Sequence, residues 1–151
     1  MDVRSLSGNL GEGARTLGGR WNPPDSFPTL YLASTLDTAV AEVRRAFAAQ
    51  GRALEEAVGL VVYEFDVELN AVLDLRDIAN LNSVGLSLDD VRSSDRRRCQ
   101  AVGDAAHFVG LEAICAPSAT GPGEVMAIFT DKQHPQSVIA PGKPSLWAAS
   151  P

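Results

Sequence analysis

The chain has 151 residues, of which 45% are hydrophobic and 21% are charged. This length and composition fit a single globular domain with a core of its own, and they exclude the disordered and low-complexity classes. The 13 lysines and arginines against 19 aspartates and glutamates give a net charge of −6. Such a balance argues against DNA or RNA as the direct ligand, because phosphate contacts supply most of that affinity. A small anion stays compatible with it, since a few local cations suffice.

The cysteines and the hydropathy pattern exclude two further classes. Cys99 and Cys115 are too few for a disulfide framework, and a structural zinc site needs about four ligands. We therefore expect no metal, and the apolar run 112–116 predicts that Cys115 is a buried free thiol. The chain shows neither a signal-peptide pattern nor an apolar run of about 18 residues, so we expect a cytoplasmic protein with no membrane contact.

The first third of the chain predicts a loop, a strand and a helix. Residues 1–28 are rich in glycine and proline, which favours irregular structure. The apolar run 29–33 predicts a buried strand. Apolar residues then recur at helical spacing, so we expect a helix over 35–50, and Ser34 followed by Asp37 resembles a capping box at its start.

The rest of the chain alternates short strands with helices. A helix is expected over 95–109 with Gly110 at its C-terminal end, and strands are expected at 59–67, 71–75, 112–116 and 125–129. The proline-rich tail, 134–151, is expected to cross the surface, with an edge strand near 138–139. The sequence thus predicts an α+β fold in one domain spanning residues 1–151, with a mixed β-sheet core and flanking helices.

The glycine-rich opening invites comparison with phosphate-binding loops, but it contains neither a Walker sequence nor the G-x-G-x-x-G pattern. The segment Gly18-Gly-Arg-Trp-Asn-Pro-Pro24 is more specific. Gly19 allows a close backbone approach, while Arg20 and Trp21 offer a guanidinium and an aromatic face that together could grip a dinucleotide. The alternative is structural: Trp21 fills the core and Arg20 is solvated.

Tyr31 and Glu42 lie on the two elements that follow. Strand alternation places Tyr31 on the face opposite Leu30 and Leu32, where a structural role is the simpler interpretation. Glu42 falls off the apolar stripe of its helix, on the polar side that it shares with Arg45. A solvated ion pair between Glu42 and Arg45 is therefore the interpretation that the helical pattern alone favours.

Three further positions carry polar chemistry. Ser118 ends a predicted strand without a nucleophile-elbow sequence, so it is a candidate for orienting a ligand rather than for nucleophilic attack. The run Arg96-Arg97-Arg98 opens a predicted helix and is most simply a solvated face. His107, beside Phe108, is most simply a structural histidine.

Taken together, these segments resemble one family, the RES domain. The most specific match is the run Gly11–Pro24, and the match continues through Leu30-Tyr-Leu-Ala-Ser34, Ala39-Val-Ala-Glu-Val43, Val72-Leu-Asp-Leu75, Cys99-Gln-Ala-Val-Gly103 and Ala116-Pro-Ser-Ala119. The resemblance spans residues 4–130 and is closest to the bacterial RES toxins of RES–Xre toxin–antitoxin pairs.

This resemblance implies a fold similar to that of ADP-ribosyltransferase toxins, with a cleft that takes NAD as substrate and needs no metal. Family members deplete NAD by breaking the nicotinamide–ribose bond, with water or phosphate as acceptor. The implied partner is an Xre-type helix-turn-helix antitoxin that blocks the cleft, and toxins of this family often form homodimers. Two alternatives remain open: transfer of ADP-ribose to a protein, and a catalytically weak module that acts through its antitoxin.

The family's functional residues carry over to individual positions. The resemblance assigns catalytic roles to Glu42, Arg4 and Tyr31, and NAD binding to Arg20, Ser118, Gly19 and Trp21. Glu42 would stabilise the positive charge that develops on the ribose as nicotinamide leaves. Arg4 and Arg20 would hold the pyrophosphate. Tyr31 would stack on or bond to the nicotinamide ribose end, and Ser118 would fix the amide or the ribose.

Two features depart from the family pattern. Arg4 stands close to the first residue, whereas family members usually carry more chain before this arginine. Glu124, in the segment after Ser118, stands near a position where asparagine is expected. A carboxylate there would weaken the binding of an anionic dinucleotide.

Overall fold

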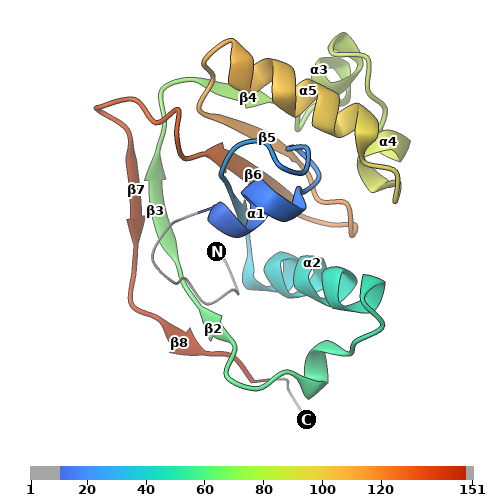
Figure 1. The fold of residues 1–151 in the computed structure, drawn as a ribbon, viewed down its shortest axis with the longest axis vertical. Coiled ribbons are helices and arrows are strands. Elements are labelled where there is room, and N and C mark those ends of the chain that lie inside the picture. The colour runs from blue at the N-terminus through green and yellow to red at the C-terminus, as the bar shows by residue number, and fades with distance from the viewer. Residues whose placement is uncertain (1–10, 149–151) are drawn as a thin grey trace.

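The computed structural model describes residues 11–148, and a four-stranded mixed sheet forms its centre (Figure 1). The strand order is β1 (Thr29–Ala33), β6 (Glu124–Phe129), β5 (Ala113–Pro117) and β4 (Val72–Asp74). The β4–β5 pair is parallel and the other two pairs are antiparallel. The sequence predicted all four strands, with slightly different ends.

Two short antiparallel ribbons accompany this sheet. One pairs β3 (Phe65–Glu68) with β7 (Val138–Pro141), and the other pairs β2 (Val61–Val62) with β8 (Ser145–Leu146). The single strand expected at 59–67 was wrong in its extent, because β2 and β3 belong to different ribbons. The proline-rich tail supplies both partners, so the edge strand expected near 138–139 is confirmed as β7.

The described helical segments are α1 (Glu12–Leu17), α2 (Leu36–Ala49), the 3-10 turn η1 (Leu54–Glu56), α3 (Ile78–Ser83), α4 (Leu88–Arg92) and α5 (Arg97–Phe108). The helices expected over 35–50 and 95–109 are confirmed as α2 and α5. The loop expected over 1–28 was wrong for α1, which starts after Gly11, a residue in the left-handed region with φ 85°. The cap of α2 also differs, because Thr35, and not Ser34, accepts the Thr38 amide proton.

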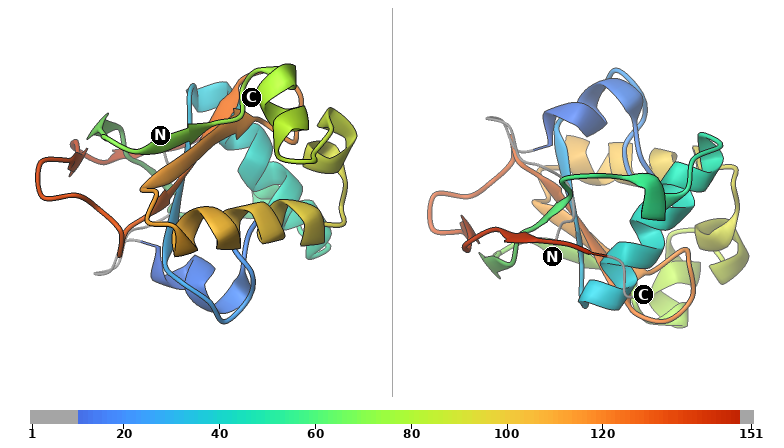
Figure 2. Two further views of the ribbon diagram at one scale, coloured as in Figure 1. Left: turned by 90° about the horizontal axis from the view of Figure 1, so that it is seen from above. Right: turned by 90° about the horizontal axis from the view of Figure 1, so that it is seen from below.

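The central sheet is covered on both faces (Figure 2). One face packs against α5 and against the loop that carries Trp21 and Phe27, with α1 on the same side. The other face, which includes Leu30 and Leu32, packs against the β3–β7 ribbon. Tyr31 packs with the first of these clusters, so the expected alternation along β1 is confirmed.

Helix α5 approaches the Trp21 backbone so closely that only glycine fits at the contact. A Cβ on Gly103 would overlap the Trp21 carbonyl oxygen. Trp21 is 0% exposed, and Asn22 beside it is equally buried. The Gly18–Pro24 segment is therefore held between α5 and β1, although its composition predicted a loop.

A buried carboxylate ties the C-terminal tail to the sheet. Glu112 is 0% exposed. Its Oε2 accepts hydrogen bonds from the Asn70 and Ala71 amides at 2.7 and 3.1 Å. Its Oε1 accepts from the His134 amide at 2.6 Å and from the Ser137 hydroxyl at 2.5 Å. Burial raises the pKa of Glu112, but these four hydrogen bonds outweigh burial and lower the pKa to about 2.

The two cysteine side chains differ in how deeply they are buried. Cys99 is fully buried beside α4, whereas Cys115 on β5 is a free thiol that is only partly buried, so the expectation of a buried thiol at Cys115 was wrong in its burial. Burial raises the pKa of both thiols. Across residues 11–148, no helix combines the length and the apolar character that crossing a membrane requires.

Candidate active site

A pocket of about 370 Å³ opens between α1, β1, α2 and the end of β5. This volume lies in the range of sites for small molecules and cofactors. The sequence-predicted site residues that line it are Gly19, Arg20, Trp21, Tyr31 and Glu42. Ser118 joins them through a hydrogen bond to Glu42. Arg4 lies outside the described residues.

Glu42 and Ser118 come together at the pocket wall from distant parts of the chain. The Ser118 hydroxyl donates to Glu42 Oε1 at 2.6 Å, and the Ala119 amide donates to the same oxygen at 3.2 Å. Ser118 is 0% exposed. Its hydroxyl therefore orients the Glu42 carboxylate, which stands on the pocket side of α2.

Arg45, one turn after Glu42 on α2, also binds the segment that follows β5. Its Nη1 donates to the Ala119 carbonyl at 2.9 Å, and its Nη2 donates to the Arg92 carbonyl at 2.9 Å. Helix α2 therefore holds both polar groups of Ala119, the amide through Glu42 and the carbonyl through Arg45. Within residues 11–148 no ion pair joins Glu42 to Arg45, so the solvated pair that the helical pattern favours does not form.

The Tyr31 hydroxyl is engaged by the protein itself. It donates to Asn22 Oδ1 at 2.6 Å and accepts from the Trp21 amide at 2.9 Å. The buried Asn22 side chain then donates to the Ala14 carbonyl at 2.7 Å, which fixes the loop against α1. Glycine is required at position 19 beside this ring, because a Cβ on Gly19 would overlap the Tyr31 hydroxyl.

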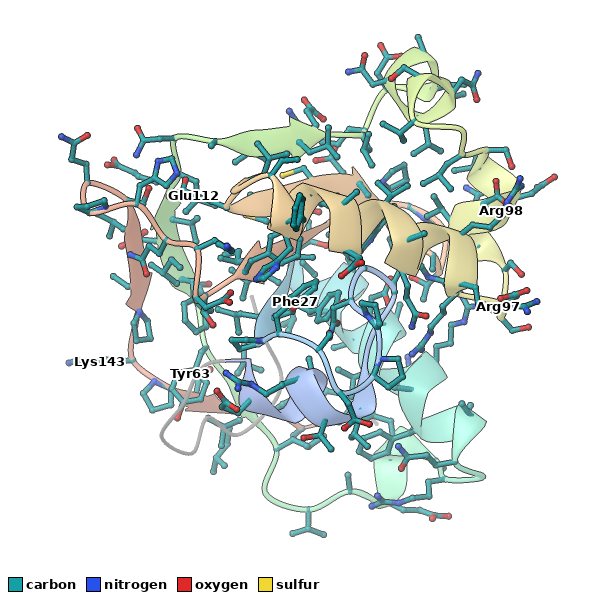
Figure 3. All side chains as sticks on the ribbon, turned by 45° about the horizontal axis from the view of Figure 1, so that its top comes forward. Phe27, Tyr63, Arg97, Arg98, Glu112 and Lys143 are labelled. Carbon is teal, nitrogen blue, oxygen red and sulfur yellow. The ribbon has the colours of Figure 1, made fainter. Side chains whose placement is uncertain are left out.

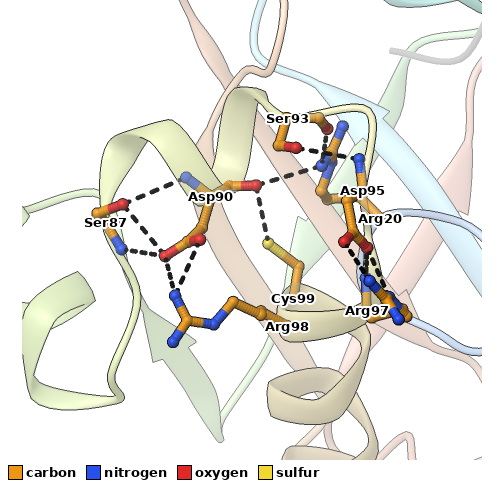
Figure 4. Close-up of polar contacts among 8 residues, drawn as sticks. All are labelled: Arg20, Ser87, Asp90, Ser93, Asp95, Arg97, Arg98 and Cys99. Carbon is orange, nitrogen blue, oxygen red and sulfur yellow. Dashed lines mark hydrogen bonds and ion pairs between the residues drawn. The ribbon is translucent and has the colours of Figure 1, made fainter.

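Arg20 reaches the C-terminal end of α4 (Figure 4). Its Nη1 donates to the Ser93 carbonyl at 2.5 Å and to the Asp90 carbonyl at 3.4 Å. Burial lowers the pKa of the Arg20 guanidinium, and the charges of Arg96 and Arg45 lower it further. An arginine nevertheless stays charged in a protein. Arg20 is therefore a partly buried cation with positive neighbours, which differs from the solvated side chain of the structural alternative.

The surroundings of Trp21 and His107 indicate structural roles for both side chains. The Trp21 side chain packs in the core, and its Nε1 is a buried donor for which the described part of the chain supplies no acceptor. This burial supports the alternative in which Trp21 fills the core. His107 stacks on Phe27 with ring centroids 3.8 Å apart, and its Nε2 lies 2.9 Å from the Asp131 carboxylate. His107 does not line the pocket, in agreement with a structural role.

Acidic groups contribute little to the pocket wall. Glu124 is exposed at the start of β6, 3.5 Å from Arg76, and it does not line the pocket. The position of Glu124 therefore does not support the expectation that its carboxylate weakens the binding of a dinucleotide in this pocket. Among the described residues, no three histidine, cysteine, aspartate or glutamate side chains gather where they could hold a metal ion.

Sequence reasoning assigned no role to Asn22 and treated Arg45 only as a solvated partner of Glu42. The signal for Asn22 was its place inside the Gly18–Pro24 segment. The signal for Arg45 was its spacing of three residues from Glu42, which places both side chains on one side of a helix. Neither signal shows which backbone groups these side chains meet, because those groups come from elsewhere in the chain.

Comparison with known proteins places the chain in a family. The model of the RES domain matches residues 3–148. The protein called NAD(+) phosphorylase MbcT, from Mycobacterium tuberculosis and from Mycobacterium bovis, is 39% identical over 127 residues, which cover 83% of this chain and 68% of MbcT. A chain in the crystal structure of the M. tuberculosis MbcT–MbcA toxin–antitoxin complex superposes with a TM-score of 0.82 at 36% identity, over 95% of this chain and 79% of that one. The resemblance seen in the sequence motifs is confirmed, and the protein belongs to the RES-domain family.

Proposed function

We propose that this protein is a toxin of a toxin–antitoxin pair that destroys NAD by phosphorolysis of its nicotinamide–ribose bond. The observation that carries the proposal is the orientation of Glu42, whose carboxylate is held by Ser118 and Ala119 at the wall of a pocket also lined by Tyr31 and Arg20. The relative MbcT is named an NAD(+) phosphorylase, and 39% of its aligned residues are identical to those of this chain.

The chemistry suits a single carboxylate with no metal. When the ribose C1′–N bond breaks, its electron pair moves to the nicotinamide ring and neutralises the cationic leaving group. Positive charge develops on the ribose, where a nearby carboxylate stabilises it. A phosphate oxygen then forms the new bond to C1′, giving ADP-ribose 1″-phosphate and nicotinamide. With water in place of phosphate the products are ADP-ribose, nicotinamide and a proton.

The remaining side chains of the pocket take supporting roles in this proposal. Arg20 supplies positive charge for the diphosphate of NAD, together with Arg4. The Tyr31 ring borders the nicotinamide ribose, while its hydroxyl keeps the glycine-rich loop in place through Asn22. Ser118 acts by holding the Glu42 carboxylate.

The partner in this proposal is an antitoxin of the Xre helix-turn-helix type that covers the pocket. The support is the solved complex of MbcT with MbcA, which is a toxin–antitoxin complex. Contact with DNA would then belong to the antitoxin, which agrees with the net charge of −6 on this chain.

The proposal also includes a homodimer within the complex and a cytoplasmic location, where NAD is available. Light scattering of the purified complex measures the stoichiometry.

The decisive experiment incubates the purified, folded protein with NAD, with and without inorganic phosphate. We expect nicotinamide to be released together with a phosphorylated ADP-ribose, and release to depend on phosphate. Release without phosphate dependence would mean hydrolysis, and label from NAD on a protein would mean ADP-ribosyl transfer. Absence of nicotinamide in both conditions would refute the enzymatic proposal and leave an antitoxin-binding module.

A substitution at Glu42 tests its role with a matched control. Glu42→Gln keeps an oxygen that can accept the Ser118 hydrogen bond but removes the negative charge, so we expect kcat to fall by roughly 100-fold or more. Glu56→Gln makes the same chemical change at an exposed position outside the pocket and should leave kcat unchanged. Equal kcat values for the two variants would contradict the role of Glu42.

A further inference from the structure

The pocket has a charge opposite to that of the protein. Its charged lining consists of three guanidiniums, from Arg20, Arg45 and Arg96, and one carboxylate, from Glu42. The whole chain has a net charge of −6. Like charges repel when they are brought together, and a local excess of cations attracts an anion even in an acidic protein. The mutual effect is visible in Arg20, whose pKa is lowered by burial and further by Arg96 and Arg45.

The three guanidiniums are not equally available to such an anion. Arg20 and Arg45 both donate to backbone carbonyls, at Ser93 for Arg20 and at Ala119 for Arg45. These carbonyls are neutral, so they orient the two side chains without neutralising them. The Arg96 guanidinium, by contrast, has neither a hydrogen bond nor an ion pair within residues 11–148.

The two arginines that follow Arg96 show the contrast within one run of sequence. Arg97 pairs with Asp95 at 2.8 Å, and Arg98 pairs with Asp90 at 3.2 Å (Figure 4). Both side chains point away from the body of the molecule (Figure 3), and neither lines the pocket. All three arginines are exposed, as expected for a solvated face, but only Arg96 also lines the pocket.

We infer that Arg96 binds a phosphoryl oxyanion at the mouth of the pocket. A guanidinium with free donors matches two phosphate oxygens at once, and the positive charges of Arg20 and Arg45 in the same pocket add to the attraction. The oxyanion has two sources in the proposed reaction, the diphosphate of NAD or the attacking inorganic phosphate. This inference rests on the proposed function only for the identity of the anion, because the binding of a phosphoryl group is measured without turnover.

The binding test uses calorimetric titration of the purified protein with two probes, ADP-ribose and inorganic phosphate. The variants are Arg96→Gln and, as the matched control, Arg97→Gln, which removes the same charge from the next residue. We expect Arg96→Gln to weaken the binding of one probe by about tenfold, the effect of losing one charge-assisted hydrogen bond, while Arg97→Gln stays within about twofold of wild type. Arg96→Lys should recover part of the affinity, because it restores the charge but not the paired donors.

The two probes distinguish the sources of the anion. A loss for ADP-ribose alone assigns Arg96 to the diphosphate of NAD, and a loss for inorganic phosphate alone assigns it to the acceptor. In kinetic assays the same variant would raise KM for the corresponding substrate and leave kcat within about twofold. Equal affinities of Arg96→Gln and Arg97→Gln for both probes would overturn the inference. Failure of the wild-type protein to release nicotinamide would instead refute the proposed function, and the titrations would still decide the role of Arg96.

Discussion

The buried carboxylate of Glu112 allows a stability prediction that can be worked out from individual hydrogen bonds. Glu112→Gln keeps the size of the side chain but replaces one carboxylate oxygen by an NH₂ group. Oε2 faces two amide protons, from Asn70 and Ala71, so NH₂ cannot replace that oxygen without leaving both unpaired. On the Oε1 side the Ser137 hydroxyl can turn to accept, which leaves only the His134 amide without an acceptor.

The expected cost follows from these contacts. One buried amide loses its acceptor, and the other donors exchange a charged acceptor for a neutral one, so we expect the free energy of unfolding to fall by about 3–5 kcal/mol. The C-terminal tail should be affected first, because Glu112 is its link to the turn that precedes β4. The assay is urea denaturation at pH 7, with Glu68→Gln, an exposed substitution on β3, as the control.

The stabilisation by Glu112 should also depend on pH. Four hydrogen bonds hold the folded-state pKa of Glu112 at about 2, below the usual glutamate value of 4.5. A lowered pKa stabilises the folded protein above the unfolded-state value, and this stabilisation is lost as the pH falls through 4.5 toward 2. The wild type should therefore lose its advantage over Glu112→Gln across this window. A deficit of less than about 0.5 kcal/mol at pH 7, or one that is constant down to pH 2, would refute this reasoning.

Three further substitutions test the packing and the site. Gly103→Ala should destabilise the protein by about 3 kcal/mol, because the new Cβ would overlap the Trp21 carbonyl. Gly13→Ala should instead stabilise α1 by about 0.5–1 kcal/mol, because the space around Gly13 is open. Thermal denaturation measures both changes. Tyr31→Phe leaves Asn22 Oδ1 and the Trp21 amide without their partner, so we expect a loss of about 1–3 kcal/mol in urea denaturation, and an unchanged midpoint would contradict the hydrogen bonds to this hydroxyl. Arg45→Gln releases the Ala119 carbonyl and should lower kcat by about tenfold or more, with only a small rise in KM for NAD from the lost positive charge. A rise in KM without a fall in kcat would instead indicate that Arg45 binds the substrate directly.

Much of the fold could be predicted because the relevant signals are local. β1 is an apolar run and α2 has apolar residues at helical spacing, and both formed where expected. The strand at 59–67 was overextended, because its apolar pattern does not reveal that the tail supplies two separate partners, one for β2 and one for β3. Helix α1 was missed because glycine and proline dominate its surroundings, while its stability depends on packing that involves Ala14.

In the candidate site, too, local motifs predicted the residue types but not their contacts. Motif resemblance selected Glu42, Tyr31, Arg20 and Gly19, which the structure places around one pocket. It did not reveal that the Tyr31 hydroxyl is engaged by Asn22, or that Trp21 is fully buried. Hydrogen bonds between residues that are distant in sequence decide such details, and a motif does not specify the partner of each donor.

The sequence by itself determined the family and the α+β class and supplied the candidate residues for the chemistry, since these follow from residue types and their local spacing. The tertiary structure alone decided how those residues are used. It separated Arg96 from Arg97 and Arg98, which are chemically identical neighbours, because only the first lines the pocket while the others meet carboxylates. It also placed three arginines and one carboxylate in the lining of a single pocket, in a chain with a net charge of −6. The physical reason is that charge acts over distances in space, and those distances are set by the packing of α2, α4 and α5 and not by their order along the chain.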